Sequence, residues 1–164
     1  MALFGMGKKK VNLVAPFAGR IVTVDEVPDP VFAQHMLGDG YAVIPAEGQA
    51  TVDVVAPVSG QLINIFGTRH AFAIIADGGL EVLVHIGLDT VELRGAGFEA
   101  LAEAGSKVIA GQPIVRMDVA KVRESGRDPI TPVVFTKAAQ VDNVKVTTGE
   151  VSDSQATVCT VTLA

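Results

Sequence analysis

The chain has 164 residues, which is enough for one domain with a substantial core, and it carries a formal net charge of −5 at pH 7. Lys and Arg form no basic stripe, which argues against nucleic-acid binding. The single cysteine, Cys159, excludes an intramolecular disulfide, and no apolar run approaches the roughly 20 residues of a membrane span. With no signal-peptide pattern, these features predict a cytoplasmic protein.

The first residues, MALFGMGKKK, differ from the rest in pattern. We expect residues 1–10 to be a flexible N-terminal segment and residues 11–164 to form one domain. Apolar Leu3, Phe4 and Met6 before three lysines would allow at most a weak peripheral membrane contact. A solvated charge run is the simpler interpretation.

Short aliphatic stretches separated by Gly, Pro, Asp and Asn dominate the remaining chain. Because aromatic residues are only 5% of the chain, the core must be built from Val, Ile, Leu and Ala, and the branched ones favour strands. This pattern predicts an all-β fold, an antiparallel sandwich or barrel-like structure. The expected strands are Val11–Val14, Arg20–Asp25, Tyr41–Pro45, Thr51–Val55, Gln61–Phe66, His70–Ile75, Leu80–Ile86, Ile114–Asp118, Thr131–Phe135 and Ala156–Leu163.

Two short stretches have helical composition. Phe98–Ala104 (FEALAEA) ends before a glycine, and Val119–Glu124 (VAKVRE) ends before Ser-Gly. We therefore expect one or two short helices beside the sheets.

A repeated sequence motif predicts that the domain has two related halves. APFAGRI (15–21) and APVSGQL (56–62) share Ala-Pro, two residues, Gly, a polar residue and an aliphatic residue. In each, Pro favours an extended segment, Gly makes the turn and a strand follows.

The candidate reactive residues are two histidines. His85 ends an aliphatic strand, where apolar neighbours would exclude water and keep the ring neutral, with one lone pair free. A turn centred on Asp77–Gly78 would place His70 directly opposite His85, about 5 Å apart at Cβ. Thr68 could orient His70, and a carbonyl near Gly87 could fix the tautomer of His85.

Such a pair fits two kinds of chemistry. One is a zinc site, with Asp89 or another carboxylate as third ligand. The other is phosphoryl transfer, with His85 as nucleophile and His70 stabilising the phosphate oxygens. No Gly-x-x-x-x-Gly-Lys pattern is present, so a phosphorylated protein is a more natural donor than ATP. We expect His35 to be a surface or packing residue.

Two other classes of protein are alternatives to a phosphoryl carrier. The AP-x-x-G pattern is similar to biotinyl and lipoyl domains, but the Met-Lys-Met of their modified hairpin is missing. A zinc hydrolase of related sandwich topology would need a third metal ligand.

The motifs together resemble a known family. GTRHAFAI (67–74) followed by LVHIGLDTVELRGAGF (83–98) is similar to the IIA domain of the glucose family of phosphoenolpyruvate-dependent phosphotransferase systems. The resemblance continues through VFAQHMLGDGYAVIP, APVSGQL, GSKVIAGQPIVRMD and TPVVFT, and it covers nearly all of Val11–Leu163.

This resemblance implies an antiparallel β-sandwich with its site in a shallow depression. His85 would accept phosphate from the histidine of HPr and pass it to a cysteine of an EIIB domain for coupled sugar uptake. His70 would hydrogen-bond the phosphoryl group, Thr68 would hold His70, and the Gly87 carbonyl would orient His85. No cofactor is required, and zinc bridging His70 and His85 would be incidental.

The resemblance also implies a docking face for both partners. Regulatory partners are known for some members of the family and are not carried over to this chain. The residues expected on the docking face are Val31, Phe32, Phe66, Phe72 and Asp89.

Overall fold

The computed structural model describes residues 8–164, which form fourteen strands and five short helical segments. The strands are β1 (Lys10–Val14), β2 (Gly19–Thr23), β3 (Gly40–Pro45), β4 (Thr51–Val55), β5 (Gly60–Ile65), β6 (Ala71–Ala76), β7 (Glu81–His85), β8 (Phe98–Ala100), β9 (Lys107–Val108), β10 (Pro113–Asp118), β11 (Thr131–Phe135), β12 (Val141–Val146), β13 (Gly149–Val151) and β14 (Thr157–Leu163). The helical segments are η1 (Val24–Glu26), α1 (Pro30–Ala33), η2 (Thr90–Leu93), α2 (Val119–Glu124) and η3 (Ala138–Gln140).

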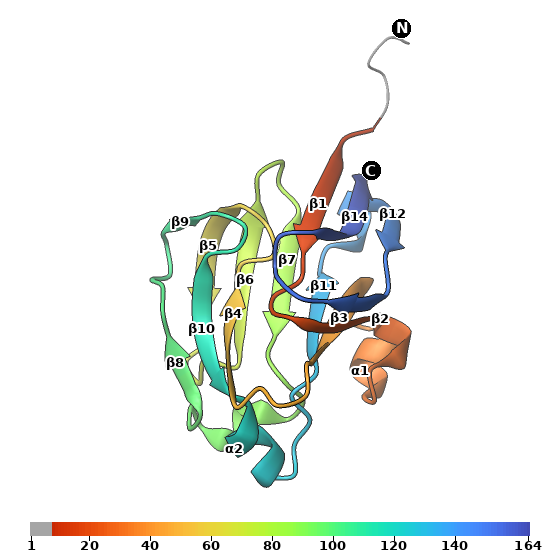
Figure 1. The fold of residues 1–164 in the computed structure, drawn as a ribbon. Helices are drawn as coiled ribbons and strands as arrows, with labels where there is room; N and C mark the ends of the chain where they lie inside the picture. The colour runs from red at the N-terminus through yellow and green to blue at the C-terminus, as the bar shows by residue number, and fades with distance from the viewer. Residues whose placement is uncertain (1–7) are drawn as a thin grey trace, which may run out of the picture.

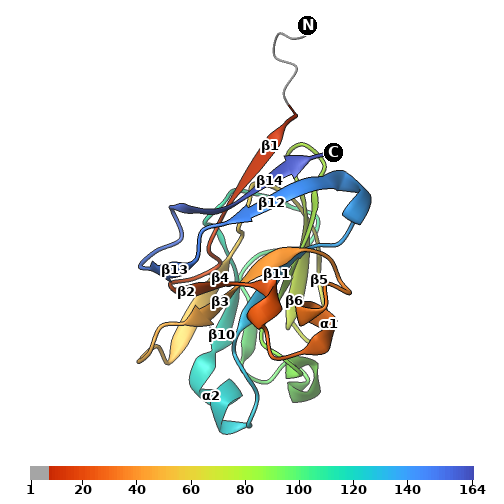
Figure 2. The same ribbon diagram turned by 90° about the vertical axis from the view of Figure 1, so that its right-hand side faces the viewer.

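The strands form three antiparallel sheets, which confirms the predicted all-β class. An eight-stranded sheet has the order β13-β2-β3-β11-β7-β6-β5-β9, and two three-stranded sheets have the orders β4-β10-β8 and β1-β14-β12. The sheet containing β4 and β10 lies in front of β5 and β6 (Figure 1). Strands β12 and β14 cross above β2 and β3 (Figure 2).

Alternation along the strands divides the apolar residues between two cores. On β7, Val82 and Val84 enter the main core, whereas Leu83 packs against a smaller cluster on the other face of the sheet. That smaller cluster is covered by the segment carrying η1 and α1, through residues such as Phe32. Because side chains alternate along a strand, His85 lies on the same face as Leu83.

The two Ala-Pro turns are related by contacts as well as by sequence. The Val14 backbone N–H donates to the Pro57 carbonyl (2.9 Å), and the Val55 N–H donates to the Pro16 carbonyl (2.8 Å). In the repeated motif, Val14 corresponds to Val55 and Pro16 corresponds to Pro57. Each half therefore donates the equivalent hydrogen bond to the other half. This arrangement agrees with the predicted internal relationship.

All ten predicted strands occur, with ends within two residues of the prediction, and the predicted helix Val119–Glu124 is α2. The helix predicted over Phe98–Ala104 is wrong, because its first residues form β8 and pair with β10. A helix of seven residues is marginal by itself, so pairing with an available strand edge prevails. The sequence prediction omitted α1, whose N-terminus is capped by Asp29 (2.9 Å to Val31 N) with Pro30 at its first position.

Residues 8–10 of the predicted flexible segment make defined contacts with the domain. Lys10 belongs to β1, the Lys9 carbonyl accepts a hydrogen bond from Leu163 N (2.8 Å), and Lys8 forms an ion pair with Asp142 (3.3 Å). Residues 1–7, which carry most of the predicted membrane contact, lie outside the described residues. No helix in residues 8–164 is long and apolar enough to span a membrane.

Candidate functional site

His85 is the last residue of β7, between β6 and β11 in the interior of the largest sheet. Its backbone pairs with Ala71 of β6, and β11 pairs with Val84 just before it, so the ring projects from a rigid position. The Phe32 ring packs against it, with centroids 5.2 Å apart at an angle of 59°. Phe32 comes from α1, so this helix covers the reactive side chain.

The tautomer of His85 is fixed by the chain that follows it. Nδ1 lies 2.7 Å from the Gly87 carbonyl oxygen, which can only accept, so Nδ1 carries the proton and donates it. Nε2 therefore keeps its lone pair. Burial lowers the pKa of His85, outweighing the Gly87 hydrogen bond and the charges of Asp29 and Asp89, which act in the opposite direction.

Gly87 is required by geometry. Its φ is +78°, and a Cβ there would lie 2.5 Å from Cγ2 of Thr90 and 3.1 Å from the Asp128 carbonyl oxygen. Thr90 is buried and its hydroxyl donates to the Ile86 carbonyl (2.5 Å). The loop that orients His85 is thus closed by a residue that the sequence analysis did not single out, although it lies within the HIGLDT motif.

Arg127 also supports this loop and was missed. Its Nε donates to the Asp89 carbonyl (3.1 Å), and its Nη2 pairs with Glu92 (2.9 Å). Arg127 lies far from Asp89 in the sequence, so no local sequence pattern pointed to this contact.

His70 lies beside His85, as predicted. The two ring centroids are 5.2 Å apart with an interplanar angle of 78°, and His70 is only 8% exposed. Its Nδ1 is 2.5 Å from Oγ1 of Thr68. The pKa of His70 is lowered by burial first and by the proximity of His85 second.

The predicted strand register is wrong by one residue. His85 pairs with Ala71, and the turn is centred on Gly78, since Ala76 N donates to the Leu80 carbonyl (2.8 Å). The turn is one residue longer than assumed because both Gly78 and Gly79 adopt positive φ. His70 precedes the strand, after Arg69 at φ +59°, so the two rings meet without being direct cross-strand partners.

The predicted docking residues divide into exposed and buried ones. Val31 is 39% exposed and Phe66 is 37% exposed, and the Phe66 ring lies 5.6 Å from that of His70. Asp89 is also exposed. Phe32 (3% exposed) and Phe72 (0%) are buried, which corrects their assignment to the docking face. Alternation on β6 directs Phe72 into the main core.

Residues 8–164 contain no group of three or more His, Cys, Asp and Glu side chains arranged to hold a metal ion. Cys159 is buried, and burial raises its pKa to about 12. A thiol in this state is a packing group.

Comparison with known proteins finds EIIA components of sugar phosphotransferase systems. The family model described as phosphoenolpyruvate-dependent sugar phosphotransferase system, EIIA 1, matches residues 11–141. The chain is 42% identical over 147 residues to the PTS system glucose-specific EIIA component of Staphylococcus aureus (strain COL), across 88% of this chain and 86% of that protein. The corresponding protein of Staphylococcus epidermidis is 41% identical over the same shares.

A solved structure is similar as well. Glucose permease IIA from Mycoplasma capricolum matches with a TM-score of 0.84 and 40% sequence identity, covering 93% of this chain and 96% of that chain. The family match spans both paired histidines and the loop that fixes the tautomer of His85. This protein therefore belongs to the EIIA 1 family of the phosphoenolpyruvate-dependent sugar phosphotransferase system.

Proposed function

We propose that this protein is a phosphocarrier, which accepts a phosphoryl group from phospho-HPr on Nε2 of His85 and donates it to a cysteine of an EIIB domain. The observation that carries the proposal is the free Nε2 of His85 next to the His70 ring, in a member of the EIIA family. The names of the relatives specify glucose, which supports an EIIB of a glucose-type permease as the acceptor. The function is assigned to a single domain, residues 11–164.

The environment of His85 suits a nucleophile at neutral pH. Its lowered pKa keeps the ring unprotonated at Nε2, and the Gly87 carbonyl holds the proton on Nδ1. In acceptance, the Nε2 lone pair forms the new N–P bond while the N–P bond to the HPr histidine breaks. The donor ring keeps the electron pair of the broken bond. The Gly87 carbonyl then stabilises the positive charge that phosphorylation places on the His85 ring.

His70 stabilises the phosphoryl oxygens in this mechanism. If the Thr68 hydroxyl donates to Nδ1 of His70, the proton of His70 resides on Nε2, where it can be donated to a phosphoryl oxygen. A loose phosphoryl-transfer transition state chiefly needs such positioning and charge stabilisation. The reaction needs no cofactor, and any zinc between His70 and His85 is incidental.

The docking face for HPr and EIIB combines exposed apolar groups with acidic ones. Val31 and Phe66 supply apolar contact area near the two histidines, while Asp29 and Asp89 act on His85 electrostatically. A small face of this kind suits weak and transient complexes, which a protein that exchanges two partners requires.

The test is a phosphorylation assay with the purified chain, phosphoenolpyruvate, Enzyme I and HPr. We expect a mass gain of one phosphoryl group per chain that is lost in acid and stable in base. His85→Gln should abolish the gain, and prior treatment with a chelator should not affect it. His35→Asn is the matched control, because it replaces the third histidine, which bonds Asp25 and Asp39, and it should still gain one phosphoryl group per chain. Stoichiometric phosphorylation of His85→Gln would disprove the assignment.

A further inference from the structure

Arg127 engages its whole guanidinium group next to the segment that follows His85. Its Nε donates to the Asp89 carbonyl (3.1 Å), its Nη2 pairs with Glu92 (2.9 Å), and its Nη1 donates to the Ser125 carbonyl (3.3 Å). The side chain is only 25% exposed. Because all three nitrogens are bound in a planar fork, the contact has a fixed geometry that the single ammonium group of a lysine cannot reproduce.

The backbone that Arg127 contacts has an unusual conformation. Asp89 adopts a φ of +57°, which is uncommon for a residue with a side chain. Gly87, two residues earlier, has a φ of +78°. Such conformations persist only where surrounding contacts fix them, and they cluster at functional sites. Contacts from outside the segment must therefore hold residues 87–89 in place.

These contacts come from two adjacent residues of the α2–β11 connection. The Asp128 carbonyl accepts the Leu88 N–H (2.9 Å), and the Arg127 side chain binds the carbonyl of the next residue, Asp89. Leu88 and Ile130 are buried in the same small cluster, which keeps the two loops side by side. The contact at Leu88 uses only backbone atoms, whereas the contact at Asp89 exists because residue 127 is an arginine.

The Gly87 carbonyl, which fixes the tautomer of His85, belongs to this supported segment. It lies 2.7 Å from Nδ1, and this hydrogen bond raises the pKa of His85 against the larger effect of burial. A change of Asp89 to an ordinary negative φ would rotate the peptide units before it, including the one that carries the Gly87 carbonyl. Arg127 is therefore placed to act on the His85 ring through the backbone.

We propose that Arg127 is a positioning residue for phosphoryl transfer: by holding the Asp89 carbonyl, it keeps the Gly87 carbonyl on Nδ1 of His85 and leaves Nε2 free for the phosphoryl group. This inference deepens the phosphocarrier function proposed above and rests on it. The geometry of the guanidinium matters more than its charge, because Nε binds a neutral carbonyl.

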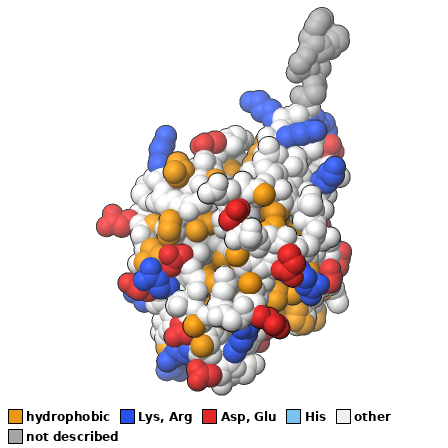
Figure 3. All heavy atoms as spheres, in the orientation of Figure 1, with side chains coloured by type: hydrophobic (Ala, Val, Ile, Leu, Met, Phe, Trp, Pro, Cys, Tyr) orange, Lys and Arg blue, Asp and Glu red, His pale blue; other side chains and the backbone are white. Residues whose placement is uncertain are grey.

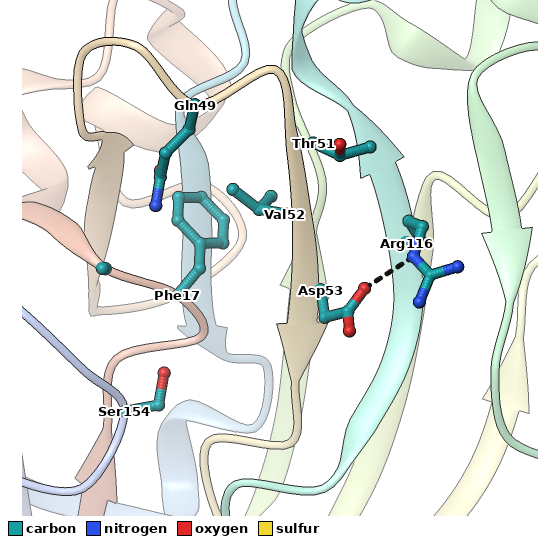
Figure 4. Close-up of a pocket in the computed structure, with 8 residues that line it drawn as sticks. Phe17, Gln49, Thr51, Val52, Asp53, Arg116 and Ser154 are labelled. Atoms are coloured by element: carbon teal, nitrogen blue, oxygen red, sulfur yellow. Dashed lines mark hydrogen bonds and ion pairs between the residues drawn. The ribbon is translucent and has the colours of Figure 1, made fainter.

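Arg116 is the matched control on another face of the molecule. Its Nε binds Oδ1 of Asp53 (2.8 Å) on the neighbouring strand (Figure 4), and its side chain is 47% exposed. Acidic and basic side chains are interspersed on this face over β4 and β10 (Figure 3). Its two ion-pair partners, Asp53 and Glu99, lie outside the segment that follows His85. Arg116 is thus an ordinary solvated ion-pair residue.

The test is ¹⁵N NMR of the histidine rings in the full chain at about pH 8, without a phosphoryl donor, where the rings are neutral. In the native chain we expect His85 to be in the Nδ1–H tautomer. Arg127→Met should give a mixture of the two tautomers and lower the pKa of His85 further, because the bond to Gly87 weakens. Arg127→Lys should give the same result although it keeps the charge, and Arg116→Met should leave His85 unchanged.

Single-turnover phosphorylation by phospho-HPr gives a second measurement. Both Arg127 variants should accept the phosphoryl group about fivefold more slowly at saturating phospho-HPr, which is the loss expected for one hydrogen bond. Arg116→Met should accept at the native rate. Glu92→Gln weakens the ion pair of Arg127 but leaves its bond to the Asp89 carbonyl, so it should resemble the native chain in both measurements.

An unchanged tautomer of His85 in both Arg127 variants would overturn the proposal, even if the rates fell, because the loss would then lie in partner docking. A native tautomer in Arg127→Lys alone would also overturn it, because the charge would then account for the effect. Failure of the phosphocarrier function would be distinguishable. In that case His85→Gln would still be phosphorylated, while the NMR result for Arg127 would stand by itself.

Discussion

The histidine pair, His70 and His85, and the single His35 occupy opposite environments. His70 is buried and His85 is half-buried, and burial lowers the pKa of each. The side chain of His35 is 40% exposed and its pKa is raised, mainly by a hydrogen bond to Asp25. The same side chain thus loses its proton more readily in one region and less readily in the other.

Direct contact with carboxylates makes the difference. Nε2 of His35 lies 2.5 Å from Oδ1 of Asp25, and Nδ1 contacts Oδ1 of Asp39, so both ring nitrogens donate and the ring is an imidazolium. We call these three residues the His35 clamp. His85 also has two acidic neighbours, but its Nδ1 binds a neutral carbonyl and burial has the larger effect on its pKa. A nearby negative charge is therefore insufficient to protonate a buried histidine without a direct hydrogen bond.

The clamp also has a structural consequence. Asp25 lies in η1 and Asp39 precedes β3, while His35 follows α1, so the clamp joins the two ends of the segment that carries Phe32 over His85. An exposed, charged contact therefore supports the buried, neutral site.

The largest expected effect comes from disturbing the His85 loop with Gly87→Ala. The added Cβ would meet Thr90 at 2.5 Å in a backbone with φ of +78°. We expect a loss of about 3 kcal/mol in the free energy of unfolding from strain and overpacking together, measured in urea. Phosphoryl acceptance should slow, because the Gly87 carbonyl moves away from Nδ1.

Gly48→Ala is the matched control for this variant. Gly48 also has positive φ (+83°), but nothing lies within 4 Å of its added Cβ. Its loss should be only about 1 kcal/mol, and phosphoryl acceptance should not change. Equal losses in the two variants would show that close packing does not fix the His85 loop.

Thr68→Val tests the orientation of His70. It removes the hydroxyl 2.5 Å from Nδ1 with little change of volume. We expect donation to EIIB to slow about five- to tenfold, with a smaller effect on acceptance from HPr, in single-turnover assays. Thr147→Val, at an exposed threonine, should leave both rates unchanged. Unaltered donation by Thr68→Val would remove Thr68 from the mechanism.

His35→Asn tests the clamp. Asn tolerates the left-handed backbone that His35 adopts at φ +59°. Because the ring is 40% exposed, solvent screening limits the expected loss to about 0.5–1 kcal/mol at about pH 6. The loss should shrink at about pH 9, because the charge of His35 is lost as the pH rises through its raised pKa. Urea unfolding at both pH values measures it, and a loss that does not depend on pH would contradict the imidazolium assignment.

The smallest signal is the titration of the three rings themselves, followed by NMR. His35 should titrate above 6.5, the ordinary value, and His70 and His85 below it. The clamp therefore contributes stability fully below pH 6.5, and this is lost as the pH rises through the raised pKa of His35. The pair contributes stability fully above pH 6.5, and this is lost as the pH falls through the lowered pKa values. Titration of all three rings at one pH would erase the contrast between the regions.

Much of the fold was predictable because strand and turn signals are local. Alternating apolar residues with Gly and Pro between them located the ten predicted strands. The Thr68–His70 and His85–Gly87 contacts each span two residues, so the sequence was sufficient to suggest them.

The tertiary structure decided what depends on partners distant in the sequence. Phe98 begins a strand because the edge of β10 is free to pair with it. The position of His70 relative to His85 depends on the length of the turn between β6 and β7. Exposure separated Phe66 from Phe72, although both are phenylalanines near the site. The sequence by itself determined ten of the strands, the places of most turns and the two reactive histidines, because these follow from local periodicity and spacing. Only the folded chain determined the charge of His35, since its carboxylate partners come from both sides of α1.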